Sequence, residues 1–572
     1  MNLNSMSSTM GLAKKRESSS NVDLSHVSRG TMMPGVVYPV SFVDVVPGDS
    51  FVVEPSVFIQ SLPLIAPLMG SFDICLEMFF AGDRLYNYKM FNNLTGAMLD
   101  PSKIIFECVT PSYIPSVPAT GTVPLNSRTD LTVAPNSLAE FMGFPVGFGP
   151  YFDKSIGYKR FNLNRALVYI DVIRNYYANQ QETHIPTGLV STDASSPGSA
   201  SIQGVELSML DQIVSASRSD QFSTDDFMDW ADICPSYRML FCRTMAPERL
   251  ETWLNTSNYD LNSGKVSVSV TDNEVVLTDA RFGSHVLRYL ELAMSGGSRY
   301  SDFVDAQFDV NVGRDTTTPV FLGSCRSSLA FDKVLQTSES SQDSPLGNLA
   351  GQGSSGEKFR RRRFSFNEHG TFMVCLSLRP RVDYSRGIDP MLLKTNLESK
   401  FAPALDRIGF QPLLQAEVDA LPLGVSGEDR SIPSVHVFGA TDPDTGQPDP
   451  RFPDPFTNSV GYQPAWSEYM SVANRLHGKL TADMRYWALD RLYSTSFVRW
   501  LRADLPSGFE SYWQWMQHVY STDRKISSYV RPDLYNFAFA DNSVGAENFI
   551  YQVALNIKAR RRKSKINIPN FI

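Results

Sequence analysis

The chain has 572 residues, of which 42% are hydrophobic, and its 52 basic and 60 acidic residues give a net charge of −8. This apolar content excludes global disorder, and the 36 Gly and 35 Pro are close to the average for folded proteins. No apolar run reaches the roughly 20 residues of a membrane helix, and no hydrophobic signal segment follows the first basic residues. We therefore expect a soluble protein, without a membrane partner, that stays in the cytoplasm of the cell that makes it.

The first segment of the chain is polar. Met1 to Asn21 is rich in Ser and would become ordered only by lying on a neighbouring molecule. We predict an extended N-terminal arm over residues 1–30. A chain of this length could form several domains, but length does not fix the number of domains. We expect residues 31–572 to form one β domain with long insertions.

Alternating apolar residues predict strands soon after this arm. The apolar residues at every second position are Val36, Tyr38, Val40 and Phe42. They should share one buried face of a strand. The sequence PGD at residues 47–49 predicts a turn, and residues 51–59 predict a second β-rich run.

Helical spacing appears in two places inside the expected insertions. One apolar face consists of Ala166, Leu167, Ile170, Ile173 and Tyr177, and a second consists of Val286, Leu290 and Met294, before Gly296-Gly297. These patterns predict two short helices, the second ended by its glycines. Between them, residues 266–278 predict a β-hairpin, and residues 191–201 are rich in Ser.

The later part of the chain again predicts strands. Residues 351–356 satisfy the pattern GxGxxG but lack the flanking strand and helix of a phosphate-binding motif, so we expect a flexible loop there. The alternating apolar residues that follow are Phe372, Val374, Leu376 and Leu378, and then Phe549, Tyr551, Val553, Leu555 and Ile557. Each set predicts a strand with one buried face. Strong strands near both ends of the chain favour a β-sandwich whose first and last strands come together.

Two basic segments are candidates for contact with a polyanion. The first is the run Arg360, Arg361, Arg362 and Arg363, and the second contains Lys558, Arg560, Arg561, Arg562, Lys563 and Lys565. No acidic residue follows Glu547, so an acidic body is joined to a basic terminal segment. The terminal segment could equally be a solvated tail that limits aggregation. The arginine run could contact either DNA or a carboxylate on a neighbouring subunit.

Aromatic residues are interleaved with the arginine run. Phe359, Phe364 and Phe366 could stack on the bases of single-stranded DNA, at about 1–3 kcal/mol per base. Packing at the edge of a strand is the simpler interpretation of the same residues, and we prefer it.

Motifs for catalysis and metal binding are weak. Glu368 and His369 should point to opposite faces of a strand and cannot jointly serve one substrate. The acidic segment 441–455 lacks the spacing of an EF-hand, and a solvated loop is the default interpretation. The six cysteines have no paired spacing and are expected to be reduced and buried. We expect no enzyme activity, no cofactor and no metal.

Several segments together resemble one protein family. In chain order they are VVPGDSF (residues 45–51), FFAGDRL (79–85), SLAEFMGFPVG (137–147), RNYYANQQE (174–182), LRYLELAMSG (287–296), PVFLGS (319–324), GNLAGQG (347–353), EHG (368–370) and GYQPAWSEYM (461–470). This order resembles the major capsid proteins of the Microviridae, which are small single-stranded DNA phages. Residues 185–232 and 415–455 carry little of the resemblance.

The resemblance implies a mainly β fold: a single eight-stranded viral jelly roll with long loop insertions that contain short helices. It further implies a T=1 icosahedral shell, enclosing circular single-stranded DNA, with residues 558–572 on its inner surface. Residues 185–280 would build an additional β-rich surface protrusion. The expected partners are an internal scaffolding protein, a DNA pilot protein and a host surface receptor. The protein would be located in the virion, which is assembled in the bacterial cytoplasm.

Two other classes of protein fit parts of the sequence. A jelly-roll carbohydrate-binding protein or glycoside-active enzyme would share the β content and the aromatic residues, but it would need paired carboxylates in a cleft. A DNA-binding protein that does not assemble would explain the basic end and leave most of the chain unexplained.

Overall fold

A computed structural model describes much of the chain, and the statements below apply to these residues. The described residues are 19–87, 90, 108–109, 135–136, 138–146, 161–162, 164–177, 184–191, 200–206, 288–289, 300–312, 317–335, 349–385, 387–403, 409–418, 459–481, 484–489, 538–541 and 546–563. No helix among them is long and apolar enough to cross a membrane.

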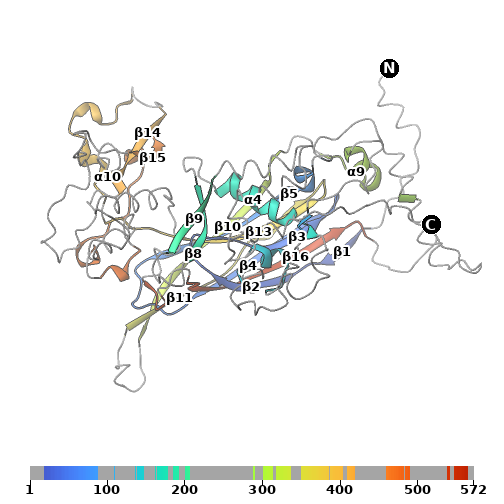
Figure 1. The fold of residues 1–572 in the computed structure, drawn as a ribbon, viewed down its shortest axis with the longest axis horizontal. Coiled ribbons are helices and arrows are strands. Elements are labelled where there is room, and N and C mark those ends of the chain that lie inside the picture. The colour runs from blue at the N-terminus through green and yellow to red at the C-terminus, as the bar shows by residue number, and fades with distance from the viewer. Residues whose placement is uncertain are drawn as a thin grey trace, which may run out of the picture.

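Eight antiparallel strands build the body of the molecule (Figure 1). They are β2 (His26–Met32), β3 (Val37–Val45), β4 (Ser50–Ser61), β5 (Ser71–Gly82), β10 (Val320–Leu335), β11 (Leu349–Lys358), β13 (Gly370–Pro380) and β16 (Phe549–Arg561). One half is ordered β2-β16-β4-β11 and the other β3-β13-β5-β10, and pairing between β10 and β11 joins them. This order is that of a jelly roll, so the predicted fold class is confirmed.

Two short strands lengthen the first half. β1 (Ser20–Asp23) pairs with β16 next to β2, and β12 (Arg362–Ser365) pairs with β4 next to β11. Residues 20–30, which we expected in the N-terminal arm, therefore belong to strands β1 and β2 or the link between them. Residues 1–18 lie outside the described part of the chain.

The main core lies between the two halves of the body. Inward side chains from both halves meet there, because alternate residues of each strand point to the same face. Phe72 of β5 lies 5.2 Å from Phe549 of β16, and Tyr38 of β3 lies 6.4 Å from Tyr551, measured between ring centroids. The predicted inward face of β16 is fully buried at every position from Phe549 to Ile557, and the structure continues it to Ala559.

Helices cover the outer face of the second half. α4 (Asn164–Val172) and the following π-helical turn η5 (Ile173–Tyr177) lie over it, as the Tyr169 hydroxyl donates to the Val37 carbonyl at 2.8 Å. Ala166 and Ile170 are buried, as predicted for this helix. Because of this layer, β13 is buried on both faces from Gly370 to Leu378, where the sequence predicted one buried face.

A β-bulge changes the orientation of the residues in β3. The register with β13 shifts between Val374 and Cys375, so the inward positions of β3 change from Tyr38 and Val40 to Val43 and Val45. Phe42 consequently points outward, with the Arg165 guanidinium 5.8 Å from its ring. The prediction that Phe42 shares the face of Tyr38 is wrong, since a bulge inserts one residue.

The glycine-rich segment 351–356 is a strand, and the prediction of a flexible loop is wrong. It forms most of β11, paired with β10 at one end and β4 at the other. A Cβ on Gly351 would lie 2.9 Å from the Pro67 Cα, and one on Gly353 would lie 2.7 Å from the Phe331 ring. Glycine serves here because neighbouring groups approach closely.

The insertions hold the remaining elements. They are η2 (Asp83–Tyr86), β6 (Cys108–Val109), α3 (Leu138–Met142), β7 (Phe161–Asn162), the hairpin β8 (His184–Ser191) and β9 (Ala200–Glu206), and α9 (Tyr300–Phe308). Hairpin β8–β9 falls in the expected protrusion. The predicted hairpin at 266–278, most of the predicted helix at 286–294, and the acidic segment 441–455 lie outside the described residues.

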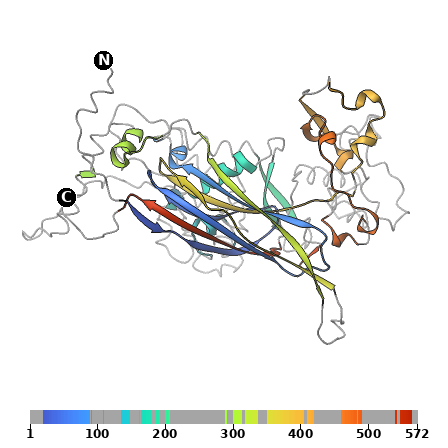
Figure 2. The same cartoon turned by 180° about the vertical axis from the view of Figure 1, so that it is seen from behind.

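A separate lobe follows β13 and lies at one end of the molecule (Figures 1 and 2). We use "the lobe" for the described residues from 384 to 487. Its elements are η7 (Pro390–Leu393), η8 (Leu397–Ser399), β14 (Phe410–Leu414), α10 (Gln415–Val418), β15 (Ser459–Pro464), α11 (Ser467–Met470), η10 (Gly478–Thr481) and η11 (Arg485–Trp487). Leu489 anchors it to the body, because its side chain is part of the main core.

The buried cysteines carry free thiols. Cys75, Cys325 and Cys375 are reduced, as predicted, and burial raises the pKa of each thiol.

A candidate nucleic-acid interface

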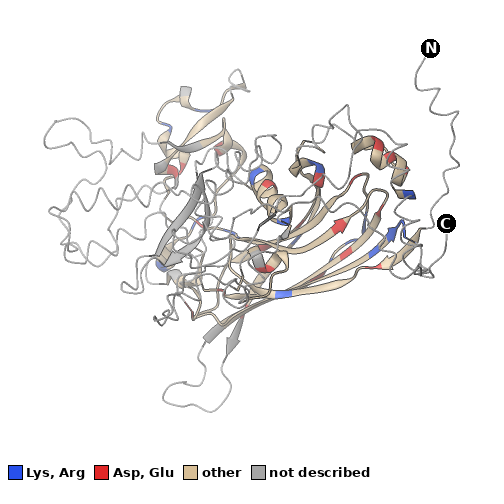
Figure 3. Cartoon of the chain, turned by 45° about the vertical axis from the view of Figure 1, so that its right-hand side comes forward, with Lys and Arg blue, Asp and Glu red and all other residues tan. Residues whose placement is uncertain are grey.

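The two basic segments meet on the outer face of one sheet. Lys558 and Arg560 alternate with the buried residues of β16, so they point away from the core and are exposed. Arg363 of β12 is exposed on the same side, because it alternates with the inward residue Phe364. Figure 3 shows Lys and Arg on the strand ends at this side of the body.

The strand register places the two segments close together. Lys558 and Arg363 are both paired with Val52 of β4, one from each side. Since neighbouring strands lie about 4.8 Å apart, the two Cα atoms are about 10 Å apart. That distance is slightly longer than the Debye length of about 8 Å at physiological salt, so salt screens much of the coupling between the two charges. Both charges nevertheless lie on the same sheet face. Arg360 and Arg361 are exposed in the link between β11 and β12.

Two acidic residues moderate this positive surface. Asp23 is paired with Lys558 across β1 and β16, and hydrogen bonds from Ser25 lower the pKa of its carboxyl, with a smaller effect of Lys558. Glu54 lies 3.2 Å from the Lys358 ammonium group. The surface thus keeps a cationic excess near Arg363, Lys558 and Arg560.

Four of the predicted arginines make contacts within the chain; one of them, the exposed Arg560, donates to the Ser19 hydroxyl at 3.0 Å. Arg561 points inward, lies 3.3 Å from the Asp49 carboxylate and donates to the Asp44 carbonyl at 2.6 Å. Arg562 packs over Gly48, whose φ of 85° forms the predicted turn. These contacts hold the end of β16 on the turn between β3 and β4, so the expected terminal segment begins as a strand.

Arg362 connects two strands of the body. Its guanidinium donates to the Ser324 carbonyl at 2.6 Å and lies over Gly323, whose φ is 135°. A Cβ on Gly323 would fall 1.7 Å from the Arg362 Nη1 atom, so only glycine leaves room for this contact. Lys563 is exposed, and Lys565 lies outside the described residues.

The phenylalanines near the arginine run pack into the core, as we preferred. Phe366 is 3% exposed, and its ring lies 5.0 Å from that of Phe51. Phe364 lies 5.9 Å from Phe372, and Phe359 packs against the same core. The Phe366 ring is therefore not available for stacking on bases, and the partly buried rings of Phe359 and Phe364 contribute to core packing.

The sequence contained signals for these orientations. Arg362, Phe364 and Phe366 occur at every second position, which indicates a shared inward face. The β16 alternation continues through Ala559 and so also predicts that Arg561 points inward. Arg29 and Lys358 are exposed on the same sheet and were missed, because each is a single cation in a polar strand.

A buried ionic cluster lies at the start of β13. The Arg84 Nε atom is 3.0 Å from the Glu368 Oε2 atom, with both side chains at most 10% exposed. Burial raises the pKa of Glu368, although Arg84 opposes this effect. Burial also raises the pKa of Asp83 to about 7, with a further contribution from Asp44, while a hydrogen bond from Asn164 acts in the opposite direction.

Glu368 and His369 face different partners. The His369 ring lies 5.1 Å from that of Phe308, its Nδ1 atom is 3.0 Å from the Tyr300 hydroxyl, and burial lowers its pKa to about 4. Both residues lie in the bend just before β13 rather than within a strand. They do not form an acid–base pair, and their contacts hold α9 and η2 on the body.

Comparisons with known proteins agree with the resemblance seen in the sequence. A family model described as capsid protein (F protein) matches residues 12–140 and 265–492. Capsid protein VP1 of Bdellovibrio phage phiMH2K is 32% identical over 134 residues, which are 23% of this chain and 25% of that protein. Capsid protein VP1 of Chlamydia phage 1 is 26% identical over 147 residues, 26% of this chain and 25% of that protein. The alignments thus span about a quarter of the length of these curated relatives.

Proposed function

Because the family model covers more than half of the chain, this protein belongs to the capsid protein (F protein) family, and we propose that it is the major capsid protein of a small single-stranded DNA phage. In this function the jelly roll is a building block that associates with further copies. The copies close into a T=1 icosahedral shell around a circular genome. The protein is then a structural component of the virion, assembled in the bacterial cytoplasm, and has no catalytic role.

The exposed cations on the β16–β4–β12 face are our candidates for contact with the genome. This proposal rests on one observation: Lys558 and Arg363 are both paired with Val52. This pairing brings together two segments that are far apart in the sequence. Cations that neutralise phosphates release counterions and bind without reading sequence. A capsid protein needs such nonspecific binding, because it must cover any part of the genome.

The structure also suggests different functions for the predicted basic residues. We assign DNA contact to Arg360, Arg361, Arg363, Lys558, Arg560 and Lys563, and we extend this assignment to Lys565. The contacts of Arg362, Arg561 and Arg562 within the chain favour a function in folding for these three.

Further partners follow from the family by analogy. They are an internal scaffolding protein, a DNA pilot protein and a host surface receptor. Residues 185–280, which include hairpin β8–β9, are our candidate for a surface protrusion. The alternative of a carbohydrate-binding or glycoside-active jelly roll gains no support from the family match.

Replacement of exposed cations tests the proposed DNA contact. We would replace Arg363, Lys558 and Arg560 together with Ser and measure DNA retained in assembled particles at increasing salt. Each lost phosphate contact should lower the slope of log affinity against log salt by about 0.7, so the triple variant should lose about 2. The fold should be unaffected, because these side chains are exposed.

A matched control removes the same charge elsewhere. Replacing the exposed residues Arg326, Lys400 and Lys479 with Ser should leave DNA retention and its salt dependence unchanged. Equal loss of DNA in both variants would show that net charge, and not this face, binds the genome. Failure of the unaltered chain to form closed particles under any salt or scaffolding condition would refute the capsid function itself.

A further inference from the structure

The β14–β15 ribbon of the lobe exposes its apolar face. Phe410 is paired with Pro464, and Pro412 with Tyr462, so these four residues lie on one side of the ribbon. All four are exposed: Phe410 is 72% and Tyr462 61% accessible to solvent. We call these four residues the ribbon face.

The opposite side of the ribbon is polar and faces the interior of the lobe. The Gln411 side chain donates to Glu468 at 2.6 Å and accepts from the Trp466 backbone N–H at 2.9 Å. Gln463 donates to Glu417 at 3.2 Å. The ribbon therefore places its glutamines inside and its aromatic residues outside, the reverse of a strand in a soluble domain.

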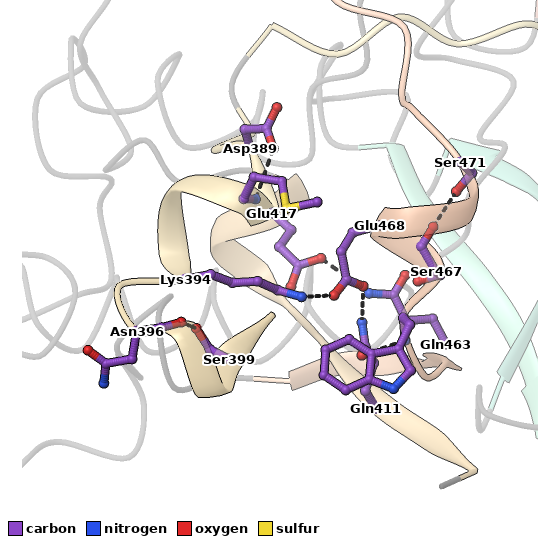
Figure 4. A network of polar contacts seen from close by, with 12 residues as sticks. Asp389, Lys394, Asn396, Ser399, Gln411, Glu417, Gln463, Ser467, Glu468 and Ser471 are labelled. Atoms are coloured by element: carbon purple, nitrogen blue, oxygen red, sulfur yellow. Dashed lines mark hydrogen bonds and ion pairs between the residues drawn. The ribbon is translucent and has the colours of Figure 1, made fainter. Parts of the chain in front are cut away.

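A buried ion pair fixes this polar interior (Figure 4). Lys394 and Glu468 form a salt bridge with side chains 15% and 5% exposed. The Lys394 ammonium also lies 4.7 Å from the centroid of the Trp466 ring. Because the buried polar groups satisfy one another, the lobe holds the ribbon in a defined orientation. The exposure of the ribbon face is thus built into the lobe.

The exposed apolar area of the lobe is large. Besides the ribbon face, Tyr469 is 66%, Met470 80% and Val472 91% exposed. The three aromatic rings alone present roughly 300–500 Å², since a complete aromatic side chain offers about 150–250 Å². The ribbon face supplies one part of the ~800 Å² that each partner contributes to a stable interface. Exposed apolar residues that share one face mark interaction sites.

Charge indicates which partner the ribbon face accepts. The ribbon face has no charged residue, and the nearest cation of the lobe network, Lys394, is already paired with Glu468. A nucleic acid would need clustered cations, and the exposed lobe residues Lys400 and Lys479 are isolated in the sequence. The end of β16 that carries Lys558 and Arg560 lies at the opposite end of the molecule from the lobe (Figure 1). Two copies of this chain each carry −8 and repel each other, so an uncharged face suits their contact.

We propose that the ribbon face is the docking surface through which the lobe binds a second copy of this chain. The four residues are buried against the neighbouring subunit, and the Lys394–Glu468 network positions them for that contact. This inference rests on the proposed capsid function, because it requires copies that assemble. It goes beyond that function by naming the surface and its partner.

Assembly of the full chain tests the proposal. We would replace Phe410 and Tyr462 together with Ser and follow particle formation by light scattering and electron microscopy. The variant should need about tenfold or more protein to assemble, because buried aromatic residues dominate interface affinity. The conservative variant Phe410→Leu with Tyr462→Phe keeps the apolar area and should assemble at nearly the original concentration. Far-UV circular dichroism should be unchanged in both.

Two further measurements make the result specific. Replacing Val27 and Phe58, which are 47% and 45% exposed, with Ser removes a smaller apolar area from the outer sheet face and should not alter assembly in the absence of DNA. In the unaltered protein, the backbone amides of residues 410–414 and 459–464 should exchange more slowly in particles than in free subunits.

The outcomes separate this proposal from the proposed function. If the unaltered chain forms no particles, the capsid function fails, and this proposal fails with it. If particles form but the Ser variant assembles equally well, or amide exchange in the ribbon is unchanged by assembly, only the docking surface is refuted. The same conclusion follows if the Ser variant loses only a scaffolding partner, or if the control variant is equally impaired.

Discussion

The jelly roll and the lobe place their polar and apolar side chains on opposite sides of their strands. In the body, β16 buries Phe549 through Ala559 at alternate positions and exposes Lys558 and Arg560. In the lobe, the β14–β15 ribbon turns its partly buried glutamines inward and exposes its aromatic residues. The body therefore gains stability by burying its apolar side chains in its own core. The lobe instead leaves apolar side chains exposed, where another molecule can bind them.

The largest expected effect is in the core of the body. Replacing Phe372, which is fully buried, with Ala should lower the free energy of unfolding by about 3–5 kcal/mol, because it leaves a cavity. Chemical denaturation followed by far-UV circular dichroism measures the change. Phe372→Leu should cost less, and a loss below about 1 kcal/mol for Phe372→Ala would contradict the core described here.

A second variant tests whether the lobe depends on its polar interior. Lys394→Met leaves Glu468 buried without its cation and should destabilise the lobe by about 2–4 kcal/mol. Tryptophan fluorescence during denaturation reports this change, since Trp466 lies beside Lys394. The double variant Lys394→Met with Glu468→Gln should recover part of the loss. An unchanged transition would mean that the ion pair does not hold the ribbon.

Asp83 is a partly buried carboxyl next to Arg84 of the buried ion pair with Glu368. Its pKa is raised to about 7 by burial, with a smaller contribution from Asp44, so between about pH 4 and 7 the folded chain keeps a proton that the unfolded chain has lost. Stability from this group therefore falls as the pH rises through that window. Asp83→Asn should raise the thermal midpoint at pH 8 by several degrees and change it little at pH 4.

The contribution of His369 to stability changes with pH in the opposite direction, so this residue provides the control for the experiment. Burial lowers its pKa to about 4, so its contribution to stability is present above its ordinary value of about 6.5 and is lost as the pH falls toward 4. The Asp83→Asn variant should retain that acid-side loss. An equal gain in midpoint at pH 4 and pH 8 would exclude a titrating Asp83.

The smallest expected effect is on the ribbon face. Phe410→Ala in the unassembled subunit should change the free energy of unfolding by less than about 0.5 kcal/mol, because the ring is 72% exposed. The same denaturation experiment used for Phe372 measures it. A loss comparable with that of Phe372→Ala would mean that Phe410 supports the lobe itself.

Much of the body could be predicted because a strand with one buried face has a period of two. The strand with Phe549 and the turn at Gly48 follow from local patterns that tertiary contacts reinforce. Phe42 and the strand at residues 351–356 were mispredicted for a physical reason. A bulge and close backbone packing depend on the neighbouring strand, which the local sequence does not reveal.

The candidate DNA surface could be predicted only in part. Clusters of arginine indicate a basic segment, but the face of each side chain depends on strand alternation, which separates Arg363 from Arg362. To predict that two distant segments pair with β4, one must know the order of the strands in the sheet. In the lobe, alternation shows that Gln411 and Phe410 lie on different faces, but it does not show which face meets water.

The central position of β16 has a consequence for synthesis on the ribosome. This strand lies between β2 and β4, and it joins residues as distant as Ser25 and Asn556, which are 531 positions apart. During translation β4 therefore lacks this neighbour until β16 has left the ribosome, and the core cannot close. A nascent chain that still lacks β16 cannot be incorporated, so only chains translated beyond this strand become competent to join a growing particle.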